Sequence, residues 1–286
     1  MRKVALIFLL VSLAGNINAQ KAQKKFERAN EMYENKEYDS ALYLFASIYN
    51  KGIGSKDLIA KSYYNIGVIY LERGNTEDAK DIFEKILSSD FNEMDRYGTG
   101  SGIMTEPYAI YKNRSCKILA NLAIKAKDFK KALEYVTMAD KEFPYRHFCG
   151  NEYAANTMYM ASLYATCYAG LGDINRGIQT LLPYVIDDGL ASNNTLIEQL
   201  CGMLKEKYSN EEIKQEVNAA ISGVYIKVIK NKDHVDSNYC AKIFNIELEL
   251  GNYAFYFDYK RSKEFNGIEL YRQSFAKSEF IKQLTQ

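Results

Sequence analysis

The sequence contains no tryptophan, only three prolines and two histidines, and a formal net charge of +1. Few prolines are typical of a mainly helical chain, because proline breaks the interior of a helix. A balance so close to neutral does not favour nucleic acid or an anionic membrane surface as the partner. After the first nineteen residues, no apolar run is long enough to span a bilayer.

Cysteine is also sparse. The five cysteines are widely spaced and form no C-x-x-C pair, so neither a zinc knuckle nor a disulfide framework is predicted. An odd number cannot pair completely within one chain. Cys116, Cys167 and Cys201 fall on helix faces that look buried, and we interpret them as small core residues.

The N-terminus has the features of an export signal. Arg2 and Lys3 precede an apolar run at residues 4–14, and a short polar stretch ends at the small residue Ala19. This pattern predicts a secretory signal peptide over residues 1–19, a mature chain beginning at Gln20, and a periplasmic or secreted protein. The mature chain keeps 35 basic residues, the 37 of the full chain without Arg2 and Lys3, against 36 acidic ones. Its net charge is therefore −1, and no membrane span is expected in it.

Residues 63–86 carry the strongest internal pattern. Two amphipathic helices are predicted, joined by a tight turn at Gly74-Asn75, with small residues at Gly67 and Ala79 where the helices must touch. This stretch resembles a tetratricopeptide repeat, whose helix pairs recur at about 34 residues. The resemblance implies a helical array that holds a partner.

The same spacing returns before and after this stretch. The marker positions of the second helix in five successive units are Ala41, Ala79, Ala132, Gly177 and Ile213. The fifth unit is degenerate, as terminal repeats commonly are. The predicted fold is mainly α, a solenoid of about five helix pairs over residues 20–230.

Residues 231–286 follow a different period. Apolar and polar residues alternate over 244–250 and again over 253–259, with Gly251-Asn252 between the two runs. This predicts a β-hairpin with a two-residue loop, whose apolar face covers the last helices. Phe280, Ile281 and Leu284 stand at helical spacing and predict a short terminal helix.

The family resemblance places a partner-binding groove on the first helix of each pair. The corresponding positions are Phe26, Asn30, Lys61, Tyr64, Asn65, Val68, Arg114, Lys117, Asn121, Tyr159 and Ser162. Some members of the family grip a peptide C-terminal carboxylate, and Asn30, Asn65 and Arg114 match that clamp. Phe26 and Ile118 stand where it needs cations, so the full clamp is not predicted, although Lys61, Arg114 and Lys117 favour an acidic segment.

Two insertions interrupt the repeats and are the other candidate sites. Residues 90–107 contain Tyr97 and a G-T-G-S-G run that follows no strand, which leaves a surface loop or a loop closing over a ligand. Residues 144–156 contain His147, Phe148 and Cys149. This segment is a packed loop with Tyr145 and Phe148 as aromatic plugs, or else a thiol dyad or metal site.

These patterns favour an exported, non-catalytic scaffold that binds a protein or peptide in the cell envelope. No catalytic residue, cofactor or metal is predicted. The alternative is an accessory protein that binds a small ligand or glycan through loops 90–107 and 144–156. A third hypothesis is an enzyme that uses Cys149 and His147.

Overall fold

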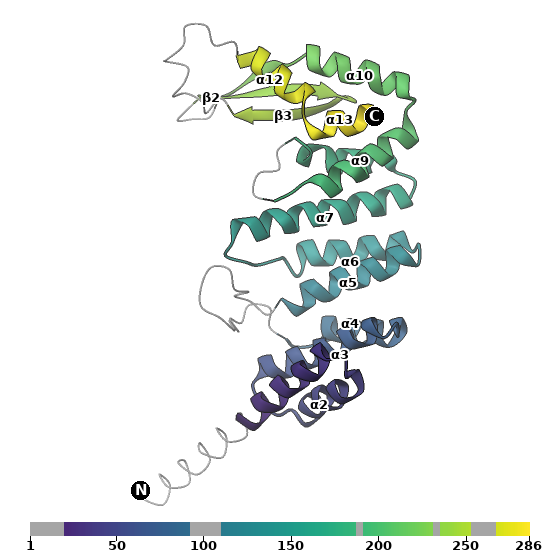
Figure 1. The fold of residues 1–286 in the computed structure, drawn as a ribbon, viewed down its shortest axis with the longest axis vertical. Coiled ribbons are helices and arrows are strands. Elements are labelled where there is room, and N and C mark those ends of the chain that lie inside the picture. Colours follow the sequence, from purple (N-terminus) through teal and green to yellow (C-terminus); the bar gives the residue numbers. More distant parts are fainter. Residues whose placement is uncertain (1–19, 92–109, 187–190, 231–234, 253–266) are drawn as a thin grey trace, which may run out of the picture. The chain divides into compact units, whose positions relative to one another are not determined.

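The computed structural model describes residues 20–91, 110–186, 191–230, 235–252 and 267–286 (Figure 1). The chain divides into two compact units, Met1–Cys149 and Gly150–Gln286, and each is described by itself. The predicted fold class is confirmed: the protein is mainly helical, its helices pack in consecutive pairs, and a small antiparallel sheet lies near the C-terminus. The predicted signal peptide lies outside the described residues.

The described part of the first unit consists of helix pairs that follow one another in chain order. A helix at residues 20–34 precedes α2 (Tyr38–Lys51), α3 (Lys56–Glu72) precedes α4 (Thr76–Ser88), and α5 (Tyr111–Lys125) precedes α6 (Phe129–Lys141). Each helix from α2 to α6 packs on the next one. This order is the repeating arrangement that the spacing predicts.

Small residues set the distance between the paired helices. Ala41, Ala79 and Ala132 are completely buried at matching positions of α2, α4 and α6. At Gly67 the partner helix comes so close that an added Cβ would lie 2.8 Å from the Phe83 ring. The large side chains around these contacts then fill the core, as the sequence predicts.

The same turn closes four successive helix pairs. The donor of its key hydrogen bond lies five residues after the acceptor carbonyl, which is the Schellman geometry, and the residue before the donor has positive φ. These bonds join Glu37 to Met32, Asn75 to Tyr70, Asp128 to Ala123, and Asp173 to Tyr168. The positive φ angles belong to Lys36, Gly74, Lys127 and Gly172. One backbone geometry therefore repeats even where lysine replaces glycine.

The second unit continues with α7 (Gly150–Gly170) and α8 (Ile174–Leu181), then α9 (Asn194–Lys207) and α10 (Asn210–Ser222). The turn between α9 and α10 differs from the other four. The Ser209 hydroxyl accepts a hydrogen bond from the Glu212 N–H, and the Glu212 carboxylate accepts one from the Ser209 N–H. This capping box starts α10 and agrees with the degenerate sequence of the fifth pair.

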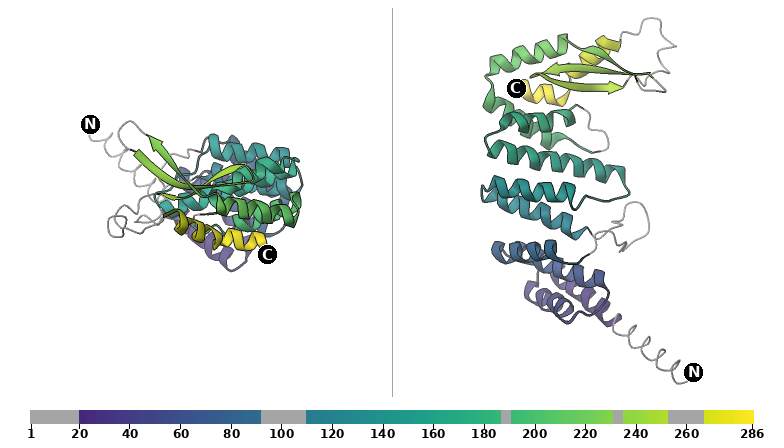
Figure 2. Two further views of the ribbon diagram at one scale, coloured as in Figure 1. Left: turned by 90° about the horizontal axis from the view of Figure 1, so that it is seen from above. Right: turned by 180° about the vertical axis from the view of Figure 1, so that it is seen from behind.

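A three-stranded antiparallel sheet follows, in the order β1 (Tyr225–Lys230), β2 (Val235–Ile243) and β3 (Ile246–Asn252). Figures 1 and 2 show the strands beside α10, α12 (Gly267–Ala276) and α13 (Glu279–Thr285). Apolar side chains of the sheet and of these helices share one core with α9. The predicted covering of the last helices by the apolar residues of 244–250 is confirmed, since Leu248 is buried in that core.

The predicted position of the hairpin loop is wrong. The turn between β2 and β3 lies at Phe244-Asn245, both with positive φ, whereas Gly251 and Asn252 belong to β3 and pair with Tyr239 and Asn238. At Gly251 an added Cβ would lie 2.7 Å from the Tyr271 ring. The glycine thus permits a close approach and does not make a turn. The predicted strand at 253–259 lies outside the described residues.

Three boundaries also differ from the prediction. Helix α10 ends at Ser222 and β1 begins at Tyr225, so the sheet starts before residue 230. The tail forms two helices, α12 and α13, where one was predicted, and Phe280, Ile281 and Leu284 of α13 are buried. Helix α7 begins at Gly150, so the second half of the predicted loop 144–156 is helical. Element boundaries are the part of a fold that local periodicity reports least well.

We expect Gly67→Ala to lower the free energy of unfolding by about 1–3 kcal/mol, because the new methyl group would clash with the Phe83 ring and Ile82. Gly202→Ala in α9 is the matched control. An added Cβ there meets no atom within 4 Å, so this change should stabilise the protein by up to about 1 kcal/mol. Urea unfolding of both variants measures the difference. Equal stabilisation by both would contradict the close approach of α3 and α4.

Candidate partner-binding site

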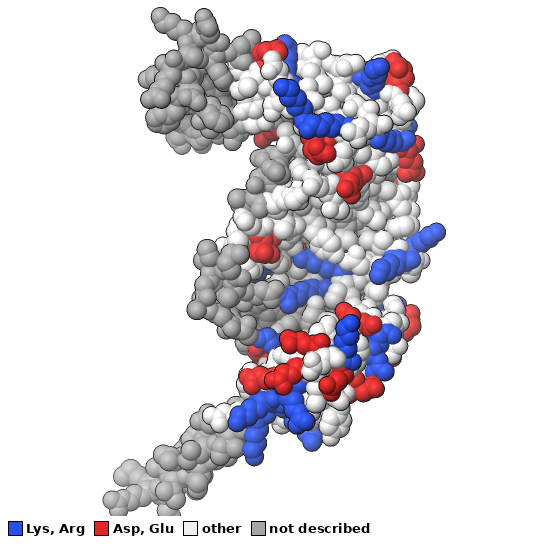
Figure 3. Space-filling model, viewed as in Figure 1, with Lys and Arg blue, Asp and Glu red and all other residues white. Residues whose placement is uncertain are grey.

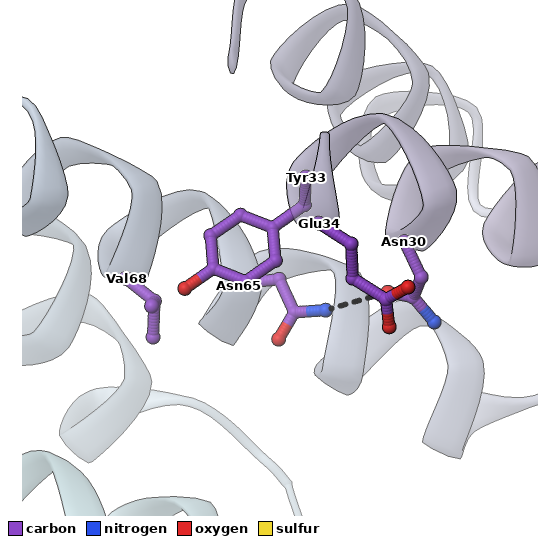
Figure 4. Close-up of a pocket in the computed structure, with 5 residues that line it drawn as sticks. All are labelled: Asn30, Tyr33, Glu34, Asn65 and Val68. Atoms are coloured by element: carbon purple, nitrogen blue, oxygen red, sulfur yellow. Dashed lines mark hydrogen bonds between the residues drawn. The ribbon is translucent and has the colours of Figure 1, made fainter. Parts of the chain in front are cut away.

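An open hollow lies between the first helix and α3 in the first unit. Its volume is about 250 Å³, and it is lined by Asn30, Tyr33, Glu34, Asn65 and Val68. Figure 4 shows Asn30, Tyr33 and Glu34 reaching from the first helix toward the two residues of α3. Three of the five were predicted groove residues. Tyr33 and Glu34 were missed, although their positions three and four residues after Asn30 place them on its helix face.

Two of the polar side chains that line this hollow are amides. Nδ2 of Asn65 donates to Oδ1 of Asn30 at 3.4 Å. An amide group carries two donor hydrogens and an acceptor oxygen with two lone pairs, so one mutual bond leaves hydrogen-bonding capacity on both residues. Such groups complement the N–H and C=O groups of an extended peptide.

Two further predicted groove residues contact neighbouring side chains in the first unit. Lys61 forms an ion pair with Asp57 at 3.1 Å. The ring of Tyr64 lies 5.6 Å from that of Phe83 and 5.3 Å from that of Tyr111, measured between centroids. The Tyr64–Tyr111 contact joins α3 to α5, so the first helices of successive pairs are neighbours.

The predicted groove residue Phe26 packs inward. Its ring meets Phe45 edge to face at 5.4 Å, and it lies against the cluster of Ala22, Ile48 and Leu58. Phe26 therefore contributes to packing in the first unit. The family pattern had placed it in the groove.

Two sets of predicted candidates meet at α5. Lys117, a predicted groove residue, has its Nζ 4.7 Å from the centroid of the Tyr145 ring, and that ring stacks on His147 at 6.1 Å. Burial, and then the charge of Arg114, lower the pKa of Lys117 from 10.5 to about 8, while Cys116 acts weakly in the opposite direction. The partly buried amine of Lys117 thus lies near the charge of Arg114 and over the ring of Tyr145.

A hydrogen bond links His147 and Cys149 within their segment. The imidazole is 6% exposed, and its Nδ1 accepts a hydrogen bond from the Cys149 backbone N–H at 3.0 Å. This bond involves the backbone of Cys149 and not its thiol. Within the described ranges, no three His, Cys, Asp or Glu side chains are grouped to hold a metal ion. Phe148 is 49% exposed and does not act as a plug, and Tyr97 lies outside the described residues.

The remaining predicted groove residues take part in helix contacts or face solvent. The Asn121 amide donates to the Lys117 carbonyl within α5. In the second unit, the Ser162 hydroxyl donates to Gln199, whose amide donates to the Ser162 carbonyl, so this pair joins α7 to α9. Tyr159 is 41% exposed.

Consecutive helix pairs, with one repeated turn and a small residue at a fixed place, define a helical repeat protein. Residues 61–90 match the tetratricopeptide repeat family model. No curated protein matches the sequence. Tetratricopeptide domains are typically non-catalytic modules that bind proteins. None of the helices in the described parts of the chain has the length and apolar character needed to cross a membrane.

We expect Lys117→Met to raise the free energy of unfolding at pH 7 by about 1–2 kcal/mol, since removing a charge that folding disfavours outweighs the lost cation–π contact. The advantage should shrink above pH 8. There the folded wild type loses the Lys117 proton while the unfolded chain keeps it, so wild-type stability rises with pH up to about 10.5.

Chemical unfolding at pH 7 and at pH 9 measures both effects. Lys125→Met, on the exposed last turn of the same helix, is the control and should show no such pH dependence. A Lys117→Met variant less stable than the wild type at pH 7 would contradict the buried-cation description.

Proposed function

We propose that this protein is an exported, non-catalytic scaffold that binds an extended segment of another protein along the first helices of its first unit. One observation carries the proposal: Asn30 and Asn65 lie side by side on neighbouring first helices and line an open hollow. The family supports a protein-interaction scaffold in general, and this amide pair supports the first helices as the binding surface.

The hollow suits a peptide backbone better than a compact metabolite. It is open to one side, and two of its polar side chains are amides, which can pair with peptide groups in both directions. Val68 and the Tyr33 ring supply apolar surface for one side chain of the bound segment. Binding through one or two such anchors and a few backbone bonds is common in peptide recognition.

Export is supported by the sequence of the first nineteen residues. These residues have a basic start, an apolar run of signal-peptide length and a small residue at position 19. Together these features are typical of a signal peptide that is cleaved during secretion. The partner would then be a protein of the cell envelope or of the medium.

We expect Asn30→Ala with Asn65→Ala to weaken partner binding about tenfold or more, because each lost hydrogen bond contributes about 0.5–1.5 kcal/mol. A photo-crosslinking amino acid placed at Val68 in the cell should trap the partner, which mass spectrometry identifies. The double variant should then reduce the adduct.

Two controls accompany this measurement. The crosslinker at Tyr43, which is 75% exposed on α2, should not trap the same partner. Asn50→Ala, an exposed asparagine of α2, should leave the adduct at Val68 unchanged. An adduct that is equally strong in the Asn30, Asn65 double variant would refute the groove.

We expect the protein isolated from its own cells to begin at Gln20, as N-terminal sequencing or intact mass would show. Ala19→Arg should block this cleavage, because the residue before the cut must be small. Asn18→Gln, one position earlier, should be cleaved normally. A full-length wild-type chain in the cytoplasm would contradict export.

A further inference from the structure

The first helices of the first two pairs end on glutamate. Acidic and basic side chains are interspersed over much of the first unit (Figure 3), but the helix at residues 20–34 ends at Glu34 and α3 ends at Glu72. A carboxylate is normally unfavourable there, because the C-terminal end of a helix carries partial negative charge. Helix α5, the first helix of the third pair, ends at Lys125 instead. The first two helix ends therefore favour a cation.

The hollow between the first helix and α3 lies against the last turn of the first helix. Tyr33 and Glu34 of that turn line it. The charge of Glu72 acts on Tyr33 as well, since burial, and then Glu72 and Tyr38, raise the pKa of the Tyr33 hydroxyl. Glutamates from two separate helices therefore contribute negative potential at the hollow.

Cations of α3 and of the residue that follows it are paired with aspartates. Lys61 forms its ion pair with Asp57 at 3.1 Å, and Arg73 forms one with Asp39 at 2.6 Å. Within the described residues, neither of the two glutamates at the helix ends forms an ion pair. A positively charged group of a ligand therefore displaces no internal cation at these carboxylates.

The groups that line the hollow complement a planar cation. The Tyr33 ring and the Glu34 side chain both point toward α3 (Figure 4), and the Tyr33 ring packs on Tyr38 with 5.9 Å between centroids. A guanidinium group stacks on an aromatic face and carries five donors. Its acceptors here are the Glu34 carboxylate and the lone pairs that the two amide oxygens keep beside their mutual bond. The methylene stem of an arginine would lie on Val68, which lines the same hollow.

We propose that Tyr33, Glu34 and the amide pair form a subsite for an arginine side chain within the bound segment. The guanidinium group stacks on the Tyr33 ring and donates hydrogen bonds to the Glu34 carboxylate. The partner of this protein is then recognised by an exposed arginine in an extended stretch of its chain. This inference rests on the proposed function and names the class of partner.

The test begins with a library of random peptides selected on the protein purified from its own cells. The selected peptides should be rich in arginine. Replacing one such arginine by citrulline, its neutral isostere, should weaken binding about 10- to 100-fold in fluorescence anisotropy, because a charge-assisted pair is lost. Lysine at that position should give an intermediate affinity, since its amine is a point charge without a planar face. Selection of peptides without arginine would overturn the inference.

Glu34→Gln should weaken the arginine peptide to a similar degree and remove its preference over the citrulline version. Glu27→Gln is the matched control, because Glu27 is exposed on the same helix, about two turns earlier. This control should leave the affinity within about twofold of the wild type, since a distant surface charge contributes little. Equal loss in the Glu27 variant, or equally tight binding of polylysine in place of the peptide, would show a general attraction for cations and overturn the subsite.

The two proposals fail in different ways. If no peptide is selected, or if binding does not respond to Asn30→Ala and Asn65→Ala, the proposed function fails. If peptides bind through the asparagines but do not respond to Glu34→Gln or to citrulline, only the arginine subsite fails. Glu34 is exposed, so lost binding in its glutamine variant would not reflect unfolding, and an unchanged circular dichroism spectrum checks this.

Discussion

The close approach of paired helices is the constraint on which the first unit depends. Gly67 leaves so little space that the Phe83 ring occupies the place of a side chain, and buried alanines recur at matching positions on the second helices. The same turn closes each helix pair of the first unit. Repetition thus aligns Asn30 with Asn65, which are distant in sequence, and makes one surface out of separate helices.

That surface changes its chemistry along the unit. Amide groups face the hollow between the first two pairs, and cations lie on the third pair. Burial, and then the charge of Arg114, lower the pKa of Lys117. The ring of Tyr145, in the turn after α6, lies beside the Lys117 amine.

The second unit shows how a different element follows the helix pairs. The fifth pair loses the repeated turn and gains a capping box, and the strands then present their apolar face to α9, α10 and the two last helices. A helix pair in an array cannot bury its outer face alone. The sheet gives that face a cover. Gly251 belongs to this packing, since Tyr271 lies where a side chain would be.

The sequence by itself determined the helix pairs, their small contact residues, the buried cysteines and the altered fifth pair. Each depends on spacing within a helix or on a local turn, which periodicity reports directly. Only the tertiary structure decided the turn at Phe244-Asn245 and the joining of β1 to the sheet, because strand pairing depends on partners elsewhere in the chain. The tertiary structure also packs Phe26 against a core cluster and places the ring of Tyr145 beside Lys117. Such contacts join segments whose distance in sequence carries no information about their distance in space.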